Sequence, residues 1–261
     1  MLLFFLVALG ASVVGAVCGI GGGVIIKPVL DLLHLESVST ISFLSGCTVL
    51  SMSCYSVIKS LLAGEKRVSL ETGTPLALGA ALGGLVGNQL FGLVRGLSDN
   101  PDRVGAVQAA CLAVITVGTL LYTRNKARIA SYCVTNKGLC VLIGLALGCM
   151  SSFLGIGGGP INLVVLYFFF SMDTKTAAAN SLYIIFFSQL CSLLTTLLTS
   201  SVPEFRWPVL VLMAAGGLGG GVLGRQLNRR MQGEAVEKLF MALMVVIICI
   251  SVFNTWRYAA G

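Results

Sequence analysis

Gly19-Ile20-Gly21-Gly22-Gly23 lies between two apolar stretches, and the same pattern returns 136 residues later as Gly155-Ile156-Gly157-Gly158-Gly159. Glycine clusters destabilise helices, so each of these two clusters predicts a point at which a helix is interrupted. Within a membrane, backbone outside a helix must be buried in protein or line a wet cavity. It leaves N–H groups free at the start of the following half-helix, where the dipole favours anions. Interruptions at matching places in two halves therefore predict a transporter's binding site; close helix packing through small residues is the alternative.

The composition indicates an integral membrane protein. Of 261 residues, 56% are hydrophobic and 10% charged, with a mean hydropathy of +0.96, whereas soluble domains carry roughly 25% charged residues. At roughly 20 apolar residues per span, the chain has room for about eight to ten membrane segments and none for a separate soluble domain. Residues 1–17 lack the basic start of a signal sequence and are expected to belong to the fold. The net charge is +7. The basic residues lie in short loops, where they are expected to set the orientation of the protein in the membrane rather than to bind nucleic acid.

The polar and reactive residues of the chain do not form the pattern of an active site. The nine cysteines are scattered without a CxxC pair, and His34 is the single histidine, so we expect small buried thiols and no metal or other cofactor. No acid/base cluster and no phosphate-binding loop is visible. The sequence therefore predicts a protein that is neither an enzyme nor an ATP-driven pump.

The two halves of the chain carry the same series of segments. Ser45 and Ser181 share the 136-residue offset, and Gly83–Leu90 corresponds to Gly220–Leu227 after a shift of one residue. The sequence predicts repeats at 1–123 and 138–261, joined by a hydrophilic linker at 124–137. The helical segments expected are 2–18, 24–34, 37–62, 72–94 and 104–122 in the first half, and 139–154, 160–171, 174–199, 206–224 and 235–256 in the second.

Loop charges predict how the repeats are related. Lys66 and Arg67 make one loop of the first half basic, whereas the matching loop at 200–205 carries only Glu204. The following loops reverse this order, because 95–103 is balanced and its counterpart holds Arg225, Arg229 and Arg230. By the positive-inside rule, matching loops face opposite sides, which is typical of inverted-topology repeats.

The predicted fold is an all-α polytopic membrane protein with two inverted-topology repeats. Each repeat has a glycine-broken or re-entrant helix hairpin and three transmembrane helices, and the sequence leaves open whether the broken segments span the bilayer. The predicted location is the plasma (inner) membrane, with the linker cytoplasmic and both termini external.

The substrate site is expected where the early turns of the helices at 37–62 and 174–199 face the glycine clusters. Neutral hydroxyl, amide and backbone N–H groups suit a weakly hydrated oxyanion that must also leave again, although such side chains also bond helix carbonyls or neighbouring helices. We expect Asn180 and Ser181 to hold a charged head and the side of Leu44 to receive an organic tail. The candidate substrate-binding residues are Gly22, Gly23, Ser45, Gly46, Gly158, Gly159, Asn180 and Ser181; Lys27, Cys47, Thr48 and Tyr183 are candidates for substrate binding or coupling.

Lys27 and Asp31 form an i,i+4 pair of opposite charge that the second half replaces with Leu163 and Tyr167. Charges inside a membrane are functional candidates. We expect this pair to lie near the interface and to reach water, as long charged side chains do.

The glycine clusters, followed by Val24-Ile25-Ile26-Lys27-Pro28 and by Pro160-Ile161, resemble the TauE/SafE sulfite-exporter family of membrane permeases. Ala178-Ala179-Asn180-Ser181-Leu182 is similar to that family's small-Thr-Ser-Leu segment, with Asn180 in place of Thr. The ends Gly87-Asn88-Gln89-Leu90 and Gly224-Arg225-Gln226-Leu227 match its Leu-Gly-x-x-x-Gly-x-x-Leu pattern. The first half departs at Ser42-Phe43-Leu44-Ser45, where Gly-Thr-Ser is usual.

The resemblance covers nearly the whole chain and implies transport of sulfur-containing anions such as sulfite, sulfoacetate and other organosulfonates. The leading hypothesis is a secondary transporter, an exporter working by alternating access, with a small anion and the lipid bilayer as partners. A thiosulfate importer that passes substrate along Cys18, Cys47 and Cys149 is one alternative, and an anion channel is another.

Overall fold

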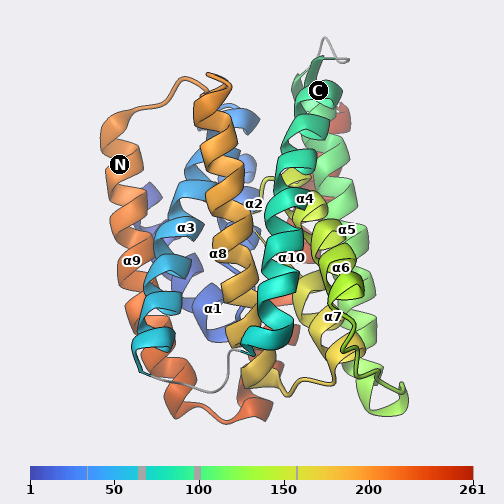
Figure 1. Ribbon diagram of the computed structural model, residues 1–261. Coiled ribbons are helices and arrows are strands. Elements are labelled where there is room, and N and C mark those ends of the chain that lie inside the picture. Colours follow the sequence, from blue (N-terminus) through green and yellow to red (C-terminus); the bar gives the residue numbers. More distant parts are fainter. Residues whose placement is uncertain (34, 64–68, 97–100, 157, 261) are drawn as a thin grey trace.

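The computed structural model describes residues 1–33, 35–63, 69–96, 101–156 and 158–260, which form ten α-helices and one 3-10 turn (Figure 1). The described part of the chain is thus all-helical, as predicted. Within the described residues, six helices are long and apolar enough to cross a membrane. These six are α3 (Val38–Leu62), α4 (Leu70–Gly96), α5 (Pro101–Asn125), α8 (Thr174–Leu198), α9 (Trp207–Arg230) and α10 (Gly233–Ala260).

Four shorter helices flank the two glycine clusters. At 1.5 Å per residue, helices of 17 and 11 residues are too short to span a bilayer individually. Each half therefore begins with a broken pair of helices and continues with three long ones. The four are α1 (Leu2–Cys18), α2 (Gly23–Leu33), α6 (Lys137–Phe153) and α7 (Pro160–Phe170).

The predicted helical segments agree with the structure to within a few residues, except at the end of α9. The prediction ended that helix at 224, but it continues to Arg230, so Arg225, Arg229 and Arg230 lie in its last two turns rather than in a loop. Arginine, glutamine and leucine are good helix formers, which explains the extension. Lys66 and Arg67, on which the loop-charge argument also rests, lie outside the described residues, as does Gly157.

The helices α3 and α8 begin with matched side-chain caps. The Ser37 hydroxyl accepts a hydrogen bond from the Thr40 N–H at 3.2 Å. The Asp173 carboxylate accepts from the N–H groups of Lys175 at 3.0 Å and Thr176 at 3.2 Å. Such caps satisfy N–H groups that the first helical turn leaves unpaired. They fix the early turns of both helices, which is where the sequence placed the candidate site.

Glycines bring the short first helix of each half against a glycine-rich helix of the other half. A Cβ atom on Gly83 of α4 would lie 2.0 Å from the Leu145 carbonyl oxygen of α6, and one on Gly224 of α9 would lie 2.5 Å from the Val13 carbonyl oxygen of α1. Only glycine permits backbones to approach this closely. Both helix pairs therefore pack through small residues.

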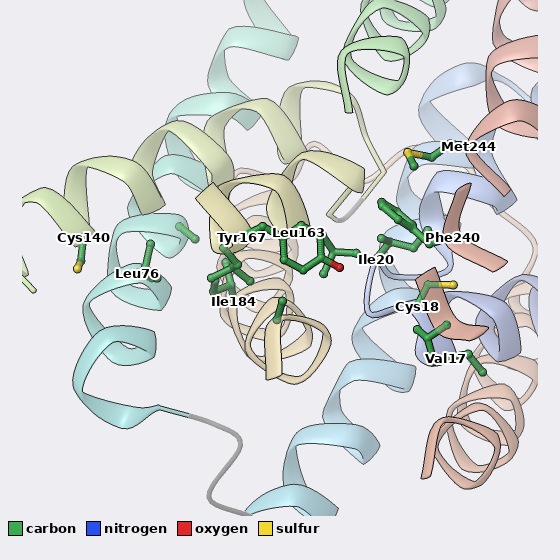
Figure 2. Packing of buried hydrophobic residues seen from close by; sticks show 14 residues of the cluster. Val17, Cys18, Ile20, Leu76, Cys140, Leu163, Tyr167, Ile184, Phe240 and Met244 are labelled. Carbon is green, nitrogen blue, oxygen red and sulfur yellow. The ribbon is translucent and has the colours of Figure 1, made fainter. Parts of the chain in front are cut away.

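The largest hydrophobic cluster surrounds the first glycine break. Figure 2 shows Ile20 between Leu163 of α7 and Phe240 of α10, and each of these side chains is at most 1% exposed. Tyr167 and Cys18 belong to the same cluster. The break is therefore embedded in protein, as backbone that leaves a helix inside a membrane must be.

The linker lies at the end of the bundle opposite to the chain termini. In Figure 1 both marked chain ends lie in the upper half, and residues 126–136 lie at the lower end. The N–H of Tyr132 donates to the Phe168 carbonyl at 2.7 Å, and that of Val134 donates to the Phe169 carbonyl at 2.9 Å. Lys126 forms an ion pair with Glu237. These contacts hold the linker against α7 and α10.

Candidate functional site

The backbone confirms that both glycine clusters interrupt the helix. Gly19 and Gly21 have φ angles of 78° and 77°, and Gly155 and Gly158 have φ angles of 64° and 142°. L-residues with a side chain rarely adopt these conformations, so glycine is strongly favoured here. The interruptions separate α1 from α2 and α6 from α7.

The two breaks pack against each other in the interior. A Cβ atom on Gly23 would lie 1.9 Å from the Ile156 carbonyl oxygen, and one on Gly158 would lie 3.4 Å from the Ile20 carbonyl oxygen. Backbone therefore meets backbone where the two halves join. Segments 136 residues apart in the sequence thus come together at one place.

Some of the candidate residues lie at this junction. The Ser45 hydroxyl would lie 3.0 Å from a Cβ on Gly23, and the Ser12 hydroxyl 3.0 Å from one on Gly22. Ser45 and Ser181 are fully buried, and their hydroxyls have no hydrogen-bond partner among the described residues. Buried hydroxyls normally have a partner. Such groups are available to a ligand that reaches the junction.

Beside the second break the structure has a cavity of about 250 Å³. It opens between the start of α3 and the ends of α4 and α8, and it reaches Gly46 and Gly155 at its inner end. Among the described residues that line it, none carries a formal charge. The polar ones are Ser39, Ser42, Asn88, Gln89, Gln108, Ser152, Gln189, Ser192, Thr195, Thr196, Thr199 and Ser201.

The inner end of the cavity presents hydrogen-bonding groups without protein partners. The Ser42 and Ser152 hydroxyls and the Gln108 Oε1 are buried and have no partner among the described residues. The Gln108 Nε2 donates to the Phe153 carbonyl at 2.6 Å, at the point where α6 stops. Gln189 is 4% exposed, and its Oε1 would lie 3.2 Å from a Cβ on Gly46. This arrangement suits a small polar ligand.

Lys27 and Asp31 lie behind the second break, and the prediction that this pair reaches water was wrong. The ammonium and the carboxylate are 3.3 Å apart, and the two residues are only 3% and 4% exposed. The Lys27 side chain passes within 3.7 Å of where a Cβ on Gly155 would lie. The short helix α2 is packed on several sides, so its charged side chains cannot extend to the surface. A buried ion pair thus lies next to the inner end of the cavity.

Three other candidate residues make contacts outside the cavity. The Asn180 amide donates from Nδ2 to the Thr176 carbonyl at 2.9 Å and accepts at Oδ1 from the Ser69 N–H at 3.2 Å. The Thr48 hydroxyl donates to the carbonyl of Leu44 at 2.8 Å. Tyr183 packs with Val57 and Ala77. In this conformation Asn180 secures the start of α4, and Gly46 is the candidate that lines the cavity.

Sequence reasoning missed several lining residues, above all Gln108, Ser152 and Gln189. They lie outside the glycine clusters, the short helix that carries Lys27 and the early turns of α3 and α8, which supplied all the predicted residues. Polar residues within apolar membrane helices are themselves a functional signal. Applying that signal to every helix would have selected Gln108 and Gln189.

The cysteines proposed for a thiosulfate path do not line the cavity. Cys18 is buried in the cluster around Ile20, and the backbone of Cys149 packs against Gly87 of α4. Cys47 is half-buried. None of the three is among the residues that line the cavity.

Comparisons with known proteins agree with this architecture. Residues 4–251 match the family model "Sulfite exporter TauE/SafE". The chain is 23% identical to the "Probable membrane transporter protein YunE" of Bacillus subtilis, over 94% of this chain and 95% of that protein. It is 25% identical to a "Probable membrane transporter protein" of Xylella fastidiosa, over 92% and 88% of the two chains. No solved structure matches the chain. The chain belongs to the TauE/SafE sulfite exporter family of membrane transporters.

Proposed function

We propose that this protein is a secondary transporter, an exporter, of a small sulfur-containing anion such as sulfite, sulfoacetate or another organosulfonate. The observation that carries the proposal is the neutral, hydrogen-bonding cavity that ends at the second glycine break with buried, unpartnered polar groups. The family model's description supports the class of substrate. A site that both binds and releases an anion should hold it through neutral donors rather than through full charge neutralisation.

The buried ion pair gives the inner end of the cavity a local electric field. Lys27 lies next to Gly155, and charges buried in a membrane protein are costly enough that they generally serve a function. The ammonium would favour an anion at the cavity's inner end, while Asp31 prevents an uncompensated positive charge when the site is empty. From there the anion would reach the glycine breaks, Ser45 and Ser181.

Alternating access would follow from two inverted repeats that rock around this site. Three features support the repeats: the two halves have the same order of short and long helices, the glycine breaks meet in the interior, and α1–α9 packing corresponds to α6–α4 packing. The termini and the linker lie at opposite ends of the bundle (Figure 1). This arrangement agrees with an odd number of crossings in each half.

We further propose that the linker faces the cytoplasm and the termini face outwards in the plasma (inner) membrane. Arg225, Arg229 and Arg230 at the end of α9 favour that orientation by the positive-inside rule. In a cysteine-free variant, a cysteine at position 128 should react with a membrane-impermeant reagent only after the cells are opened. Labelling of position 128 in intact cells would show the opposite orientation.

Selective binding should appear as thermal stabilisation of the purified protein. A ligand that binds only the folded state at about 100 times its Kd adds roughly 2.7 kcal/mol of stability. We expect sulfite or a sulfonate such as sulfoacetate or isethionate to raise the melting temperature, and taurine, which is zwitterionic, to raise it less. Sulfate and thiosulfate complete the panel. Stabilisation by thiosulfate alone would favour the importer alternative.

The same assay tests the cavity. Losing a hydrogen bond to a charged group costs roughly 1.5–3 kcal/mol, so Gln189→Leu should weaken anion binding by about tenfold to a hundredfold. Gln226→Leu is the matched control, because Gln226 is exposed on α9 and does not line the cavity. Equal anion affinity in both variants would show that the cavity does not bind the anion.

A further inference from the structure

The structure contains a second, smaller pocket at the opposite end of α3 and α8. Its volume is about 50 Å³, and Ser60, Lys175 and Arg229 are among the residues that line it. The larger cavity is lined by Ser39 at the other end of α3 and by Thr199 just after α8. From Ser39 to Ser60 the helix rises about 30 Å, which is the thickness of a bilayer's hydrocarbon core. The two openings therefore lie about one membrane thickness apart.

The two pockets correspond residue by residue. Every residue that lines the smaller pocket has a counterpart 136 or 137 positions away that lines the larger cavity. Ser56 corresponds to Ser192, for example, and Ala16 to Ser152. These are the offsets of the sequence repeat, so the pockets are the same structural feature formed once at each end.

A hydrogen bond at each pocket is also repeated. The Arg225 Nη1 donates to the Ser56 carbonyl at 2.8 Å and links α9 to α3. At the counterpart positions the Asn88 Nδ2 donates to the Ser192 carbonyl at 3.4 Å and links α4 to α8. The guanidinium extends further from its helix than the amide does. It therefore spans the smaller pocket, whereas Asn88 leaves the larger cavity open.

Side-chain size explains why the pocket at one end is smaller than the cavity at the other. Leu182 lines the smaller pocket where Gly46 lines the larger cavity, and Arg229 stands where the other end has Gly92. Leu182 also belongs to a buried apolar cluster with Ala16, Val49, Met52 and Ile185. Of this cluster, Ala16 and Leu182 line the smaller pocket, and Ile185 lies against Gly158 of the second break.

Charge distinguishes the two ends more sharply than size does. Lys175, Arg225 and Arg229 line the smaller pocket, and their counterparts in the larger cavity are Ser39, Asn88 and Gly92. Among the described residues, no carboxylate lines either pocket. Three cations around a small volume attract oxyanions, and the partial burial of Arg225 strengthens that attraction over the fully solvated case.

We propose that the smaller pocket is an anion-binding site at the second mouth of the transport path, and that Arg225 closes it. An oxyanion of the sulfite or sulfonate class would draw the Arg225 guanidinium from the Ser56 carbonyl. That exchange couples anion arrival to release of the α9–α3 contact. The role in transport rests on the proposed function, whereas the binding of anions and the closure do not.

Paired cysteine reactivity tests the site directly. In the purified, cysteine-free chain, a single cysteine is placed at position 179 in the smaller pocket or at position 43, its counterpart in the larger cavity. The anionic reagent methanethiosulfonate ethylsulfonate, itself a sulfonate, is compared with its trimethylammonium analogue. We expect a higher anion-to-cation rate ratio at position 179 than at position 43. Arg225→Asn should lower that ratio about tenfold while raising the rate with the cationic reagent, because the pocket opens.

Two variants separate charge from folding. Arg225→Lys should retain the anion preference, and Arg230→Asn, at an exposed arginine that does not line the pocket, should change neither rate. Equal ratios at positions 179 and 43, or the same response to Arg225→Asn and Arg230→Asn, would overturn the proposal. Protection of position 179 by phosphatidylglycerol but not by isethionate would assign the pocket to a lipid headgroup and would also overturn it. These rates require no transport, so their outcome is independent of whether sulfur anions are carried.

Discussion

Replacing Lys27 with Met is expected to cost about 3–5 kcal/mol of stability, because it removes one partner of a buried ion pair and keeps the Asp31 carboxylate in the interior. That loss is a large part of the 5–15 kcal/mol that typically stabilises a folded protein. The measurement is the yield of monodisperse protein after detergent extraction, together with its melting temperature. We expect both to fall steeply.

The second half of the chain supplies the matched control. It has Leu163 and Tyr167 at the positions that correspond to Lys27 and Asp31, so Lys27→Leu combined with Asp31→Tyr should recover much of the lost stability. Replacing a buried ion pair with apolar residues is often neutral or stabilising. If the pair also serves the anion, the double variant should fold but bind no sulfite. A double variant as unstable as Lys27→Met would show that the cost does not come from the carboxylate that has lost Lys27.

Replacing Gly23 with Ala is expected to destabilise the protein and to abolish anion binding. The new methyl group would lie 1.9 Å from the Ile156 carbonyl oxygen, so the two glycine breaks would have to separate. Overpacking a core costs typically about 1–3 kcal/mol, occasionally more. We expect a cost at or above the upper end, because the obstacle is backbone and has no alternative rotamer.

Gly10→Ala is the control for this change. Gly10 lies in the preceding helix α1 and has nothing within 4 Å of an added Cβ, so alanine should stabilise the helix there by about 0.5–1 kcal/mol. Melting temperature and sulfite binding would be measured for both variants. Similar behaviour of the two would contradict close contact between the breaks.

The helical framework could be predicted because single residues determine it. Gly19 and Gly155 interrupt apolar stretches with a backbone that residues with a side chain rarely adopt, and capping by Ser37 and Asp173 fixes where the next long helices begin. These are local effects. The corresponding boundaries were therefore predicted closely.

The candidate site was harder to predict because it depends on packing between distant segments. Asn180 has the right chemistry for an anion, but Ser69, far away in the sequence, engages its amide. The cavity at one end is larger than the pocket at the other because Gly46 and Gly92 are small where Leu182 and Arg229 are large. Lys27 is buried because helices from both halves surround α2. None of these outcomes follows from local sequence.

Exchange of labelled sulfite or isethionate in liposomes tests the central claim, which is carriage of a sulfur anion through this cavity. Liposomes with the reconstituted protein would be loaded with the unlabelled anion and diluted into a trace of the labelled one. A carrier predicts transient accumulation of label above its equilibrium level, saturation with external anion, and a reduced signal in Gln189→Leu but not in Gln226→Leu. Equilibration without accumulation would indicate a channel, and uptake equal to that of protein-free liposomes for every sulfur anion would contradict the proposed function.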